Sequence, residues 1–151
     1  MYKFSFKIRH KGCAESSFSA RFPDYYITII DIQYKNPKTK QYLYYINGDN
    51  KKFDEIINYL NTIKSYKKSE EVERTKDNLL LLVELQQKGY IQNIIQKHNG
   101  FLIDLHTVQA GLEYWHVGIL KRESIGLIRN DIEKEGDMKV ISISEVDFSY
   151  K

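Results

Sequence analysis

Cysteine, proline and long apolar runs are scarce in this chain of 151 residues. The single cysteine, Cys13, has no partner for an internal disulfide, which agrees with a reducing compartment. No stretch approaches ~20 apolar residues, so we expect no membrane span. Residues 1–10 alternate polar with apolar side chains, unlike the continuous apolar segment of a signal peptide. We therefore expect a cytoplasmic protein.

Charge of one sign is not concentrated anywhere in the sequence. The 23 Lys and Arg residues are offset by 20 Asp and Glu residues, which leaves a net charge of +3. The densest basic cluster, Lys64, Lys67 and Lys68, is followed at once by Glu70 and Glu71. A DNA-reading module would concentrate basic residues on one helix or face. We therefore do not expect direct nucleic-acid binding.

Apolar spacing in the first half predicts a regular order of elements. Alternation with a period of two predicts a strand over about 2–9, and runs dense in β-branched and aromatic residues predict strands over 25–34 and 41–47. A further strand is expected over about 66–75. A short helix is expected at 14–20, and helical spacing from residue 50 predicts a helix that ends near residue 64. The two middle strands are expected to form a hairpin.

The second half repeats this order. It predicts strands over 79–85, 101–109 and 112–119, a final strand from about residue 140, and helices near 90–95 and 122–135. Asn99-Gly100 suits a left-handed end of the first helix, and Ala110-Gly111 suits a tight hairpin. We expect Leu82 and Ile128 to be core residues.

The repeated order of strand, helix, hairpin, helix and strand is that of a ferredoxin-like unit. The sequence therefore predicts an α+β fold of two tandem ferredoxin-like βαββαβ units, at residues 1–75 and 76–151. Each unit would have an antiparallel sheet with its helices on one face. A unit of ~75 residues buries little core by itself, so the units should dock against each other or against another chain, as in a homo-oligomer. An extended sheet and two sheets with facing helices are both compatible with the pattern.

The dipeptide Lys-Gly occurs at matching points of the two halves, as Lys11-Gly12 and Lys88-Gly89. Each follows a strand and precedes a short helix, where backbone N–H groups at the helix N-terminus can face an anion. We predict ligand-binding residues there, with Cys13 beside the first glycine. The alternative is that both loops are ordinary turns.

Metal and catalytic motifs are weak. His10 and Cys13 are close enough to share a metal, but two ligands do not make a site, so we predict neither a metal nor a cofactor. An exposed Cys13 would be reactive and a buried one inert. No recognised nucleophile or nucleotide motif occurs, so we predict no catalytic residue. A small enzyme remains an alternative if a cleft encloses His106 or His116 with a carboxylate.

Aromatic residues gather on the third strand of each half, including Tyr44, Tyr114 and Trp115. RNA-recognition domains carry stacking aromatics on an exposed sheet of the same architecture. An RNA-binding module is therefore a second alternative, with these three residues as its aromatic surface. Burial of the aromatics at a docking surface would explain the pattern equally well.

The segment His10–Pro23 (HKGCAESSFSARFP), with Gly89, the Trp115 strand and the closing helix and strand, resembles the N-terminal sensory region of archaeal bacterio-opsin-activator-type helix-turn-helix regulators. That family usually carries a helix-turn-helix after this region, whereas this sequence stops at Lys151. The resemblance implies a sensor in transcription regulation that acts through a DNA-binding partner protein. The tandem order also resembles paired ACT-type domains, which implies a small-molecule ligand at the strand-to-helix loops or between the units. A non-catalytic regulatory protein is our leading hypothesis.

Overall fold

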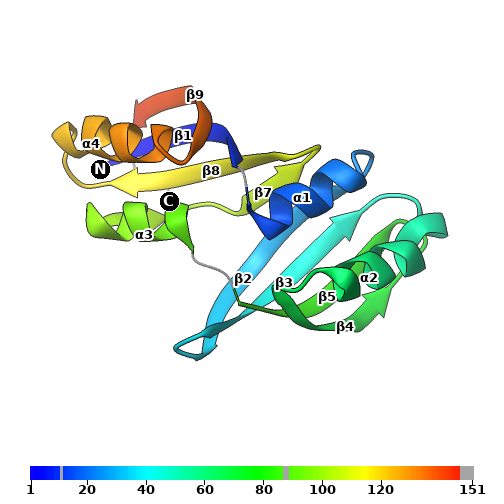
Figure 1. Cartoon of the computed structure of the whole chain (residues 1–151). Helices are drawn as coiled ribbons and strands as arrows, with labels where there is room; N and C mark the ends of the chain where they lie inside the picture. The colour runs from blue at the N-terminus through cyan, green and yellow to red at the C-terminus, as the bar shows by residue number, and fades with distance from the viewer. Residues whose placement is uncertain (11, 87–88, 147–151) are drawn as a thin grey trace, which may run out of the picture.

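The computed structural model describes residues 1–10, 12–86 and 89–146, and over these residues it is an α+β fold (Figure 1). The strands are β1 (Tyr2–His10), β2 (Tyr26–Asn36), β3 (Thr39–Asn47), β4 (Tyr66–Arg74), β5 (Asn78–Leu85), β6 (Gly100–Leu102), β7 (His106–Gln109), β8 (Leu112–Ile119) and β9 (Gly136–Glu145). The helices are α1 (Ala14–Arg21), α2 (Phe53–Thr62), α3 (Tyr90–Lys97) and α4 (Glu123–Glu133), and a 3₁₀ turn, η1 (Asn50–Lys52), precedes α2.

All nine strands in the described part of the chain belong to one antiparallel sheet. Their order is β4-β5-β3-β2-β7-β8-β1-β9, and β6 pairs with β8. Because β7 pairs with one end of β8 and β6 with the other, these two short strands are halves of one broken strand. The sequence predicts an unbroken strand here. The break comes at Asp104, whose carboxylate accepts a hydrogen bond from the Leu105 N–H at 2.8 Å.

Strand pairing does not follow the predicted boundary between residues 75 and 76. β1 lies between β8 and β9, and β5 lies between β3 and β4. Each half of the chain thus contributes its first strand to the part of the sheet built mainly by the other half. Of the two packings compatible with the sequence, the structure has the single extended sheet.

The predicted turns are confirmed by their backbone angles. Asn99, at the end of α3, has φ +55°, and Ala110 and Gly111, between β7 and β8, have φ +49° and +82°. These values lie in the left-handed region, which a tight hairpin of the mirror-image type requires at both central positions.

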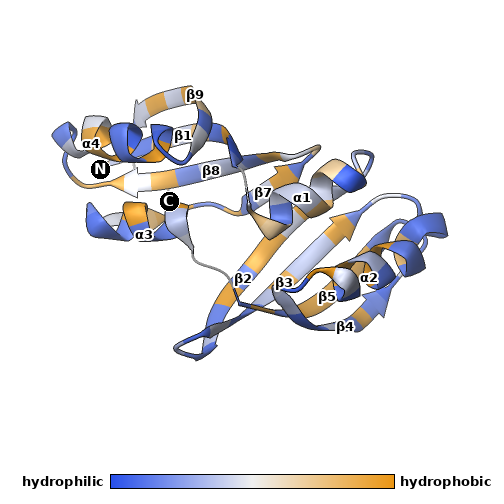
Figure 2. Cartoon of the chain, in the orientation of Figure 1, coloured by the Kyte–Doolittle hydropathy of each residue, from blue (hydrophilic) through white to orange (hydrophobic). Residues whose placement is uncertain are grey.

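Two hydrophobic cores lie on one face of the sheet. Residues paired across antiparallel strands share a face, and the register links a buried row through Leu79, Ile46, Ile27, Val108, Glu113 and Ile8. The first core packs α1 and α2 on β2, β3 and β5, and the second packs α3 and α4 on β1 and β8. Figure 2 shows apolar and polar residues interspersed along β2. All four helices therefore cover the same face.

One of the two predicted core residues is misplaced. Ile128 is fully buried in the second core, as expected. Leu82 is only half-buried, because it projects from the face opposite the helices, while Leu81 and Val83 fill the first core. None of the helices within the described ranges is long and apolar enough to cross a membrane.

Candidate functional site

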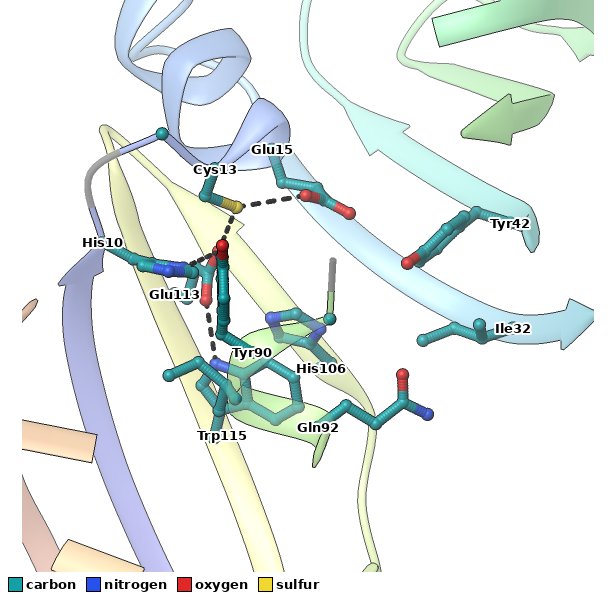
Figure 3. A pocket seen from close by; sticks show the side chains of 13 residues that line it. His10, Cys13, Glu15, Ile32, Tyr42, Tyr90, Gln92, His106, Glu113 and Trp115 are labelled. Atoms are coloured by element: carbon teal, nitrogen blue, oxygen red, sulfur yellow. Dashed lines mark hydrogen bonds and ion pairs between the residues drawn. The ribbon is translucent and has the colours of Figure 1, made fainter. Parts of the chain in front are cut away.

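The two glycine loops meet at one pocket. We call it the loop pocket; its volume is about 220 Å³, and it is lined by His10, Gly12, Cys13, Glu15, Ile32, Tyr42, Gly89, Tyr90, Ile91, Gln92, His106, Glu113 and Trp115. The β1–α1 loop runs from a strand of the second core to a helix of the first, and the β5–α3 loop runs the opposite way. Residues of both connections, including Gly12 and Gly89, line the pocket, whose labelled side chains are drawn in Figure 3.

Three of the five predicted ligand-binding residues line this pocket, namely Gly12, Cys13 and Gly89. Lys11 and Lys88 lie outside the described residues. Another lysine, Lys40 of β3, comes close to Gly89: a Cβ atom added to the glycine would lie 2.6 Å from the Lys40 ammonium. The lysine that the structure places beside the β5–α3 loop is thus Lys40, which does not belong to either Lys-Gly dipeptide.

The two glycines differ in what they require. Gly12 has φ +76°, so a larger residue would be strained there by its backbone angle. Gly89 has φ −81°, which any residue can adopt, and no side chain caps α3, whose N-cap it forms. The backbone angle of Gly89 therefore does not require glycine. A side chain at position 89 is instead restricted by the small space between Gly89 and Lys40.

Glu113 lies at the centre of the buried side chains of the pocket (Figure 3). Its Oε2 accepts a hydrogen bond from Trp115 Nε1 at 3.0 Å, and its Oε1 accepts one from Ser16 Oγ at 3.3 Å. Oε1 also lies 2.7 Å from Cys13 Sγ and 4.0 Å from His10 Nδ1. Burial alone would raise the pKa of Glu113, but these contacts and the nearby His106 outweigh it and lower the pKa from 4.5 to about 2.

The side chains of His10 and Cys13 respond to this carboxylate. Glu113 raises the pKa of His10, which outweighs the opposite effect of burial. Burial, Glu15 and Glu113 together raise the pKa of the Cys13 thiol, so the thiol stays protonated. By the criterion of exposure, Cys13 is an inert buried cysteine and not a reactive one.

His106 is the buried histidine of the pocket wall. Its ring stacks on Trp115 at 3.9 Å between centroids, and neither ring nitrogen has a hydrogen-bond partner. Burial lowers the pKa of His106, with Glu113 and Glu15 opposing the shift only in part. A neutral imidazole is therefore held in the pocket with one donor and one acceptor unused.

The predicted aromatic surface is not formed. Tyr44 is 0% exposed and its hydroxyl donates to Glu15 Oε1 at 3.2 Å, while Trp115 is 5% exposed. Both side chains point to the helix-covered face. Tyr114 precedes Trp115 on the same strand, so it projects from the other face, where it is half-buried. An exposed platform of Tyr44 and Trp115, which RNA binding would need, is thus contradicted by burial.

Several functional residues are missing from the sequence predictions. Glu113 had a usable signal: alternation along 112–119 puts it on the same face as Trp115, Val117 and Ile119, and a carboxylate in an apolar row needs partners. Glu15 and Gln92 offered none, because polar residues on short helices are usually solvated. Lys40 is also buried, although its position on a strand gives no hint of this.

A second pocket of about 550 Å³ adjoins the loop pocket and shares Gly89 and Tyr90 with it. Lys38 and Lys40 line it. The Lys40 ammonium bonds to Gln92 Oε1 at 3.0 Å and lies 5.3 Å from the centre of the Tyr34 ring. No carboxylate among the described residues forms an ion pair with Lys40, so its charge is available to an anionic group.

The arrangement does not resemble an activated nucleophile. Cys13 is protonated, Glu113 is ionised but already accepts several hydrogen bonds, and His106 is not bonded to either group. His10, Cys13 and Glu113 do form a set of metal-ligand type, because one donor atom from each lies within 4.8 Å of the others. The sequence offered only two of these three donors.

The protein thus has an α+β fold, and its candidate site lies between the β1–α1 and β5–α3 loops. The chain belongs to the HVO_2525_N family, an N-terminal family that matches residues 3–138. No curated protein matches the chain.

Proposed function

We propose that this protein is a non-catalytic sensor that binds a small ligand in the loop pocket and acts in transcription regulation. The ligand site belongs to both strand-to-helix loops at once, and it lies between the two cores. The observation that carries the proposal is His106, whose two ring nitrogens are buried in the pocket without partners. A buried polar group without a partner costs free energy, which a bound ligand can return.

The sheet supports a finer description of the fold. The strands β2-β3-β5-β4 and β7-β8-β1-β9 each follow the spatial order second, third, first, fourth of a ferredoxin-like unit. We propose two ferredoxin-like halves that have exchanged their first strands. Exchange explains why both Lys-Gly loops cross between the cores and converge on one pocket.

The ligand is proposed to carry an anionic group. Lys40 lies beside Gly89 and has no carboxylate partner among the described residues, and it faces the adjoining pocket. A ligand that spans the edge of the loop pocket can place a carboxylate or phosphate against this ammonium. The volume of the loop pocket fits a metabolite of about amino-acid size or an ion with its remaining ligands.

Signalling is proposed to use the crossing loops. A ligand that contacts Gly12 and Gly89 touches connections that link the two cores, so binding can change how the cores or a second copy associate. The resemblance to bacterio-opsin-activator-type regulators favours a readout through a DNA-binding partner protein. The proposal therefore includes two partners, a second copy of this chain and a DNA-binding protein.

A small enzyme is the second candidate, and one observation favours it. The loop pocket encloses His106 together with Glu113 and Glu15, which is the combination expected of a cleft for acid–base chemistry. The state of these groups argues against it: Glu113 is held ionised and Cys13 protonated, and each is engaged with neighbours instead of being poised to transfer a proton. Binding without turnover is therefore the better account.

A thermal-shift panel of amino acids, nucleotides and divalent metal ions tests the proposal on wild-type protein and on His106→Phe. Phenylalanine keeps an aromatic ring against Trp115 but removes both ring nitrogens. At least one class should raise the melting temperature of the wild type in a saturable way, and the variant should lose most of that shift.

His116→Phe is the matched control, because His116 lies next to Trp115 on β8 but bonds to Ser5 at 2.8 Å on the opposite face. It should keep the ligand response of the wild type. A panel without any saturable shift would overturn the proposal. So would an organic compound whose shift has the same concentration dependence in His106→Phe as in the wild type.

A further inference from the structure

We infer that the sensed ligand is a divalent transition-metal ion held by His10 Nδ1, Cys13 Sγ and one carboxylate oxygen of Glu113. The inference deepens the proposed function and rests on it, since it names the ligand of the loop pocket. The three residues come from β1, the β1–α1 loop and β8, and Figure 3 shows their side chains pointing toward one another.

The distances are close to those that a bound ion sets. Cys13 Sγ and Glu113 Oε1 are 2.7 Å apart, and His10 Nδ1 and Glu113 Oε1 are 4.0 Å apart. A tetrahedral zinc ion separates its sulfur and oxygen ligands by about 3.6 Å and its nitrogen and oxygen ligands by about 3.4 Å. Each of these two pairs therefore needs to move by less than about 1 Å, and the third pair, His10 Nδ1 and Cys13 Sγ, lies within 4.8 Å.

The unused atoms of the cluster also point to a cation. His10 is 9% exposed, and its Nδ1 has no hydrogen-bond partner. Cys13 Sγ lies within hydrogen-bond distance of two carboxylates, Glu113 at 2.7 Å and Glu15 at 3.1 Å. A thiol has one proton and can donate it to only one of them. An ion between sulfur, nitrogen and oxygen displaces the thiol proton to solvent and binds the thiolate, which resolves both the missing partner and the excess of acceptors.

Glu113 is already oriented as a metal ligand. Trp115 Nε1 donates to its Oε2 and Ser16 Oγ donates to its Oε1, so the carboxylate is fixed from outside the cluster. Such outer contacts are usual around ligating carboxylates and set their direction. The rest of the loop pocket, with Gln92 and His106 in its wall, leaves room for a further ligand on the ion. Three protein ligands and an open position are typical of sites that exchange a ligand.

The donor set selects the kind of ion. A sulfur, an imidazole nitrogen and one carboxylate oxygen suit Zn²⁺ or Co²⁺, whereas Ca²⁺ and Mg²⁺ prefer oxygen ligands alone. Of the four histidines in the chain, His98 bonds to Asp131 at 2.8 Å and His116 bonds to Ser5. These two serve as controls, because neither belongs to the cluster.

Titration of metal-free wild-type protein with Co²⁺ tests the inference. We expect one ion per chain, a thiolate-to-cobalt charge-transfer band in the near ultraviolet, and loss of the band when Zn²⁺ is added. Cys13→Ser should abolish the band. His10→Gln and Glu113→Gln should weaken Zn²⁺ binding at least tenfold, while His98→Gln and His116→Gln should bind like the wild type. Circular dichroism confirms the fold of each variant.

Absence of the thiolate band in wild-type protein would overturn the inference without any variant. Equal Zn²⁺ affinity in the wild type, His10→Gln and Cys13→Ser would also overturn it. If Co²⁺ and Zn²⁺ fail but an organic compound raises the melting temperature in a His106-dependent way, the metal inference falls and the proposed sensor function stands. If no metal and no compound binds, both fall.

Discussion

At the scale of single residues, His106 combines two features that stability alone does not favour. It is buried against Trp115, and both of its ring nitrogens lack partners. Because an unpaired buried polar group costs about 1–3 kcal/mol, His106→Phe should raise the free energy of unfolding of the ligand-free protein by about that amount. Urea denaturation measures it.

His116→Phe provides the comparison, since it removes a hydrogen bond to Ser5 and relieves no unpaired group. It should leave stability unchanged or lower it. A His106→Phe protein that is less stable than the wild type would show that the imidazole has a structural role and would remove the main support for a ligand at this position.

Glu113 predicts a pH dependence whose sign follows from its lowered pKa. Folding shifts that pKa from 4.5 to about 2, so the carboxylate stabilises the native state above pH 4.5. This contribution, roughly 3 kcal/mol, is lost as the pH falls from 4.5 toward 2. Glu113→Gln lacks the ionisable carboxylate and therefore this contribution. The difference in free energy of unfolding between wild type and variant should shrink as the pH falls from 4.5 toward 2 in metal-free buffer. A constant difference in urea denaturation would contradict the assignment.

The residue scale is also where the sequence was least informative. Gly12 and Gly89 could be found because the Lys-Gly dipeptide repeats at matching points of the two halves, and Cys13 because it is the single cysteine and follows Gly12. Glu113 and Lys40 could not be joined to them, because their proximity depends on strand pairing between segments about a hundred or about fifty residues away in the chain. Local patterns carry no record of such long-range contacts.

At the scale of elements, periodicity was a good guide. The helices and strands lie within a few residues of their predicted positions, because their apolar spacing is regular and their turns contain Gly, Asn or Pro. The exception is the broken strand at Asp104, where a side chain competes with the sheet for a backbone N–H. The face of β5 was also ambiguous, since an unbroken leucine run gives no alternation to read.

Substitutions at Ile128 and Leu82 test which face of the sheet the helices cover. Ile128→Ala should lower the free energy of unfolding by about 2–5 kcal/mol, because the residue is fully buried in the second core and its removal leaves a cavity. Leu82→Ala should cost clearly less, because Leu82 is half-buried on the other face. Equal losses in chemical denaturation would mean that the second face of the sheet is covered as well as the first.

At the scale of the whole molecule, β1 lies between β8 and β9 and β5 lies between β3 and β4, so each core depends on a strand from the other half of the chain. The order of elements was predictable from sequence, but the choice of partner strand was not, since strand pairing depends on long-range contacts that local patterns do not record. We predict a single unfolding transition in urea, with Trp115 fluorescence and far-ultraviolet circular dichroism following the same curve. Two separated transitions would instead favour independent units at residues 1–75 and 76–151.

The central claim is that a ligand occupies the loop pocket, and Trp115 reports on that pocket directly. It is the only tryptophan in the chain, it lines the pocket, and it contacts both His106 and Glu113. The decisive measurement is therefore a titration of Trp115 fluorescence with the organic compounds that raise the melting temperature. We predict a saturable change in emission for the wild type that is absent in His106→Phe. A ligand that stabilises the protein while Trp115 emission stays constant would place the binding site elsewhere and contradict the account.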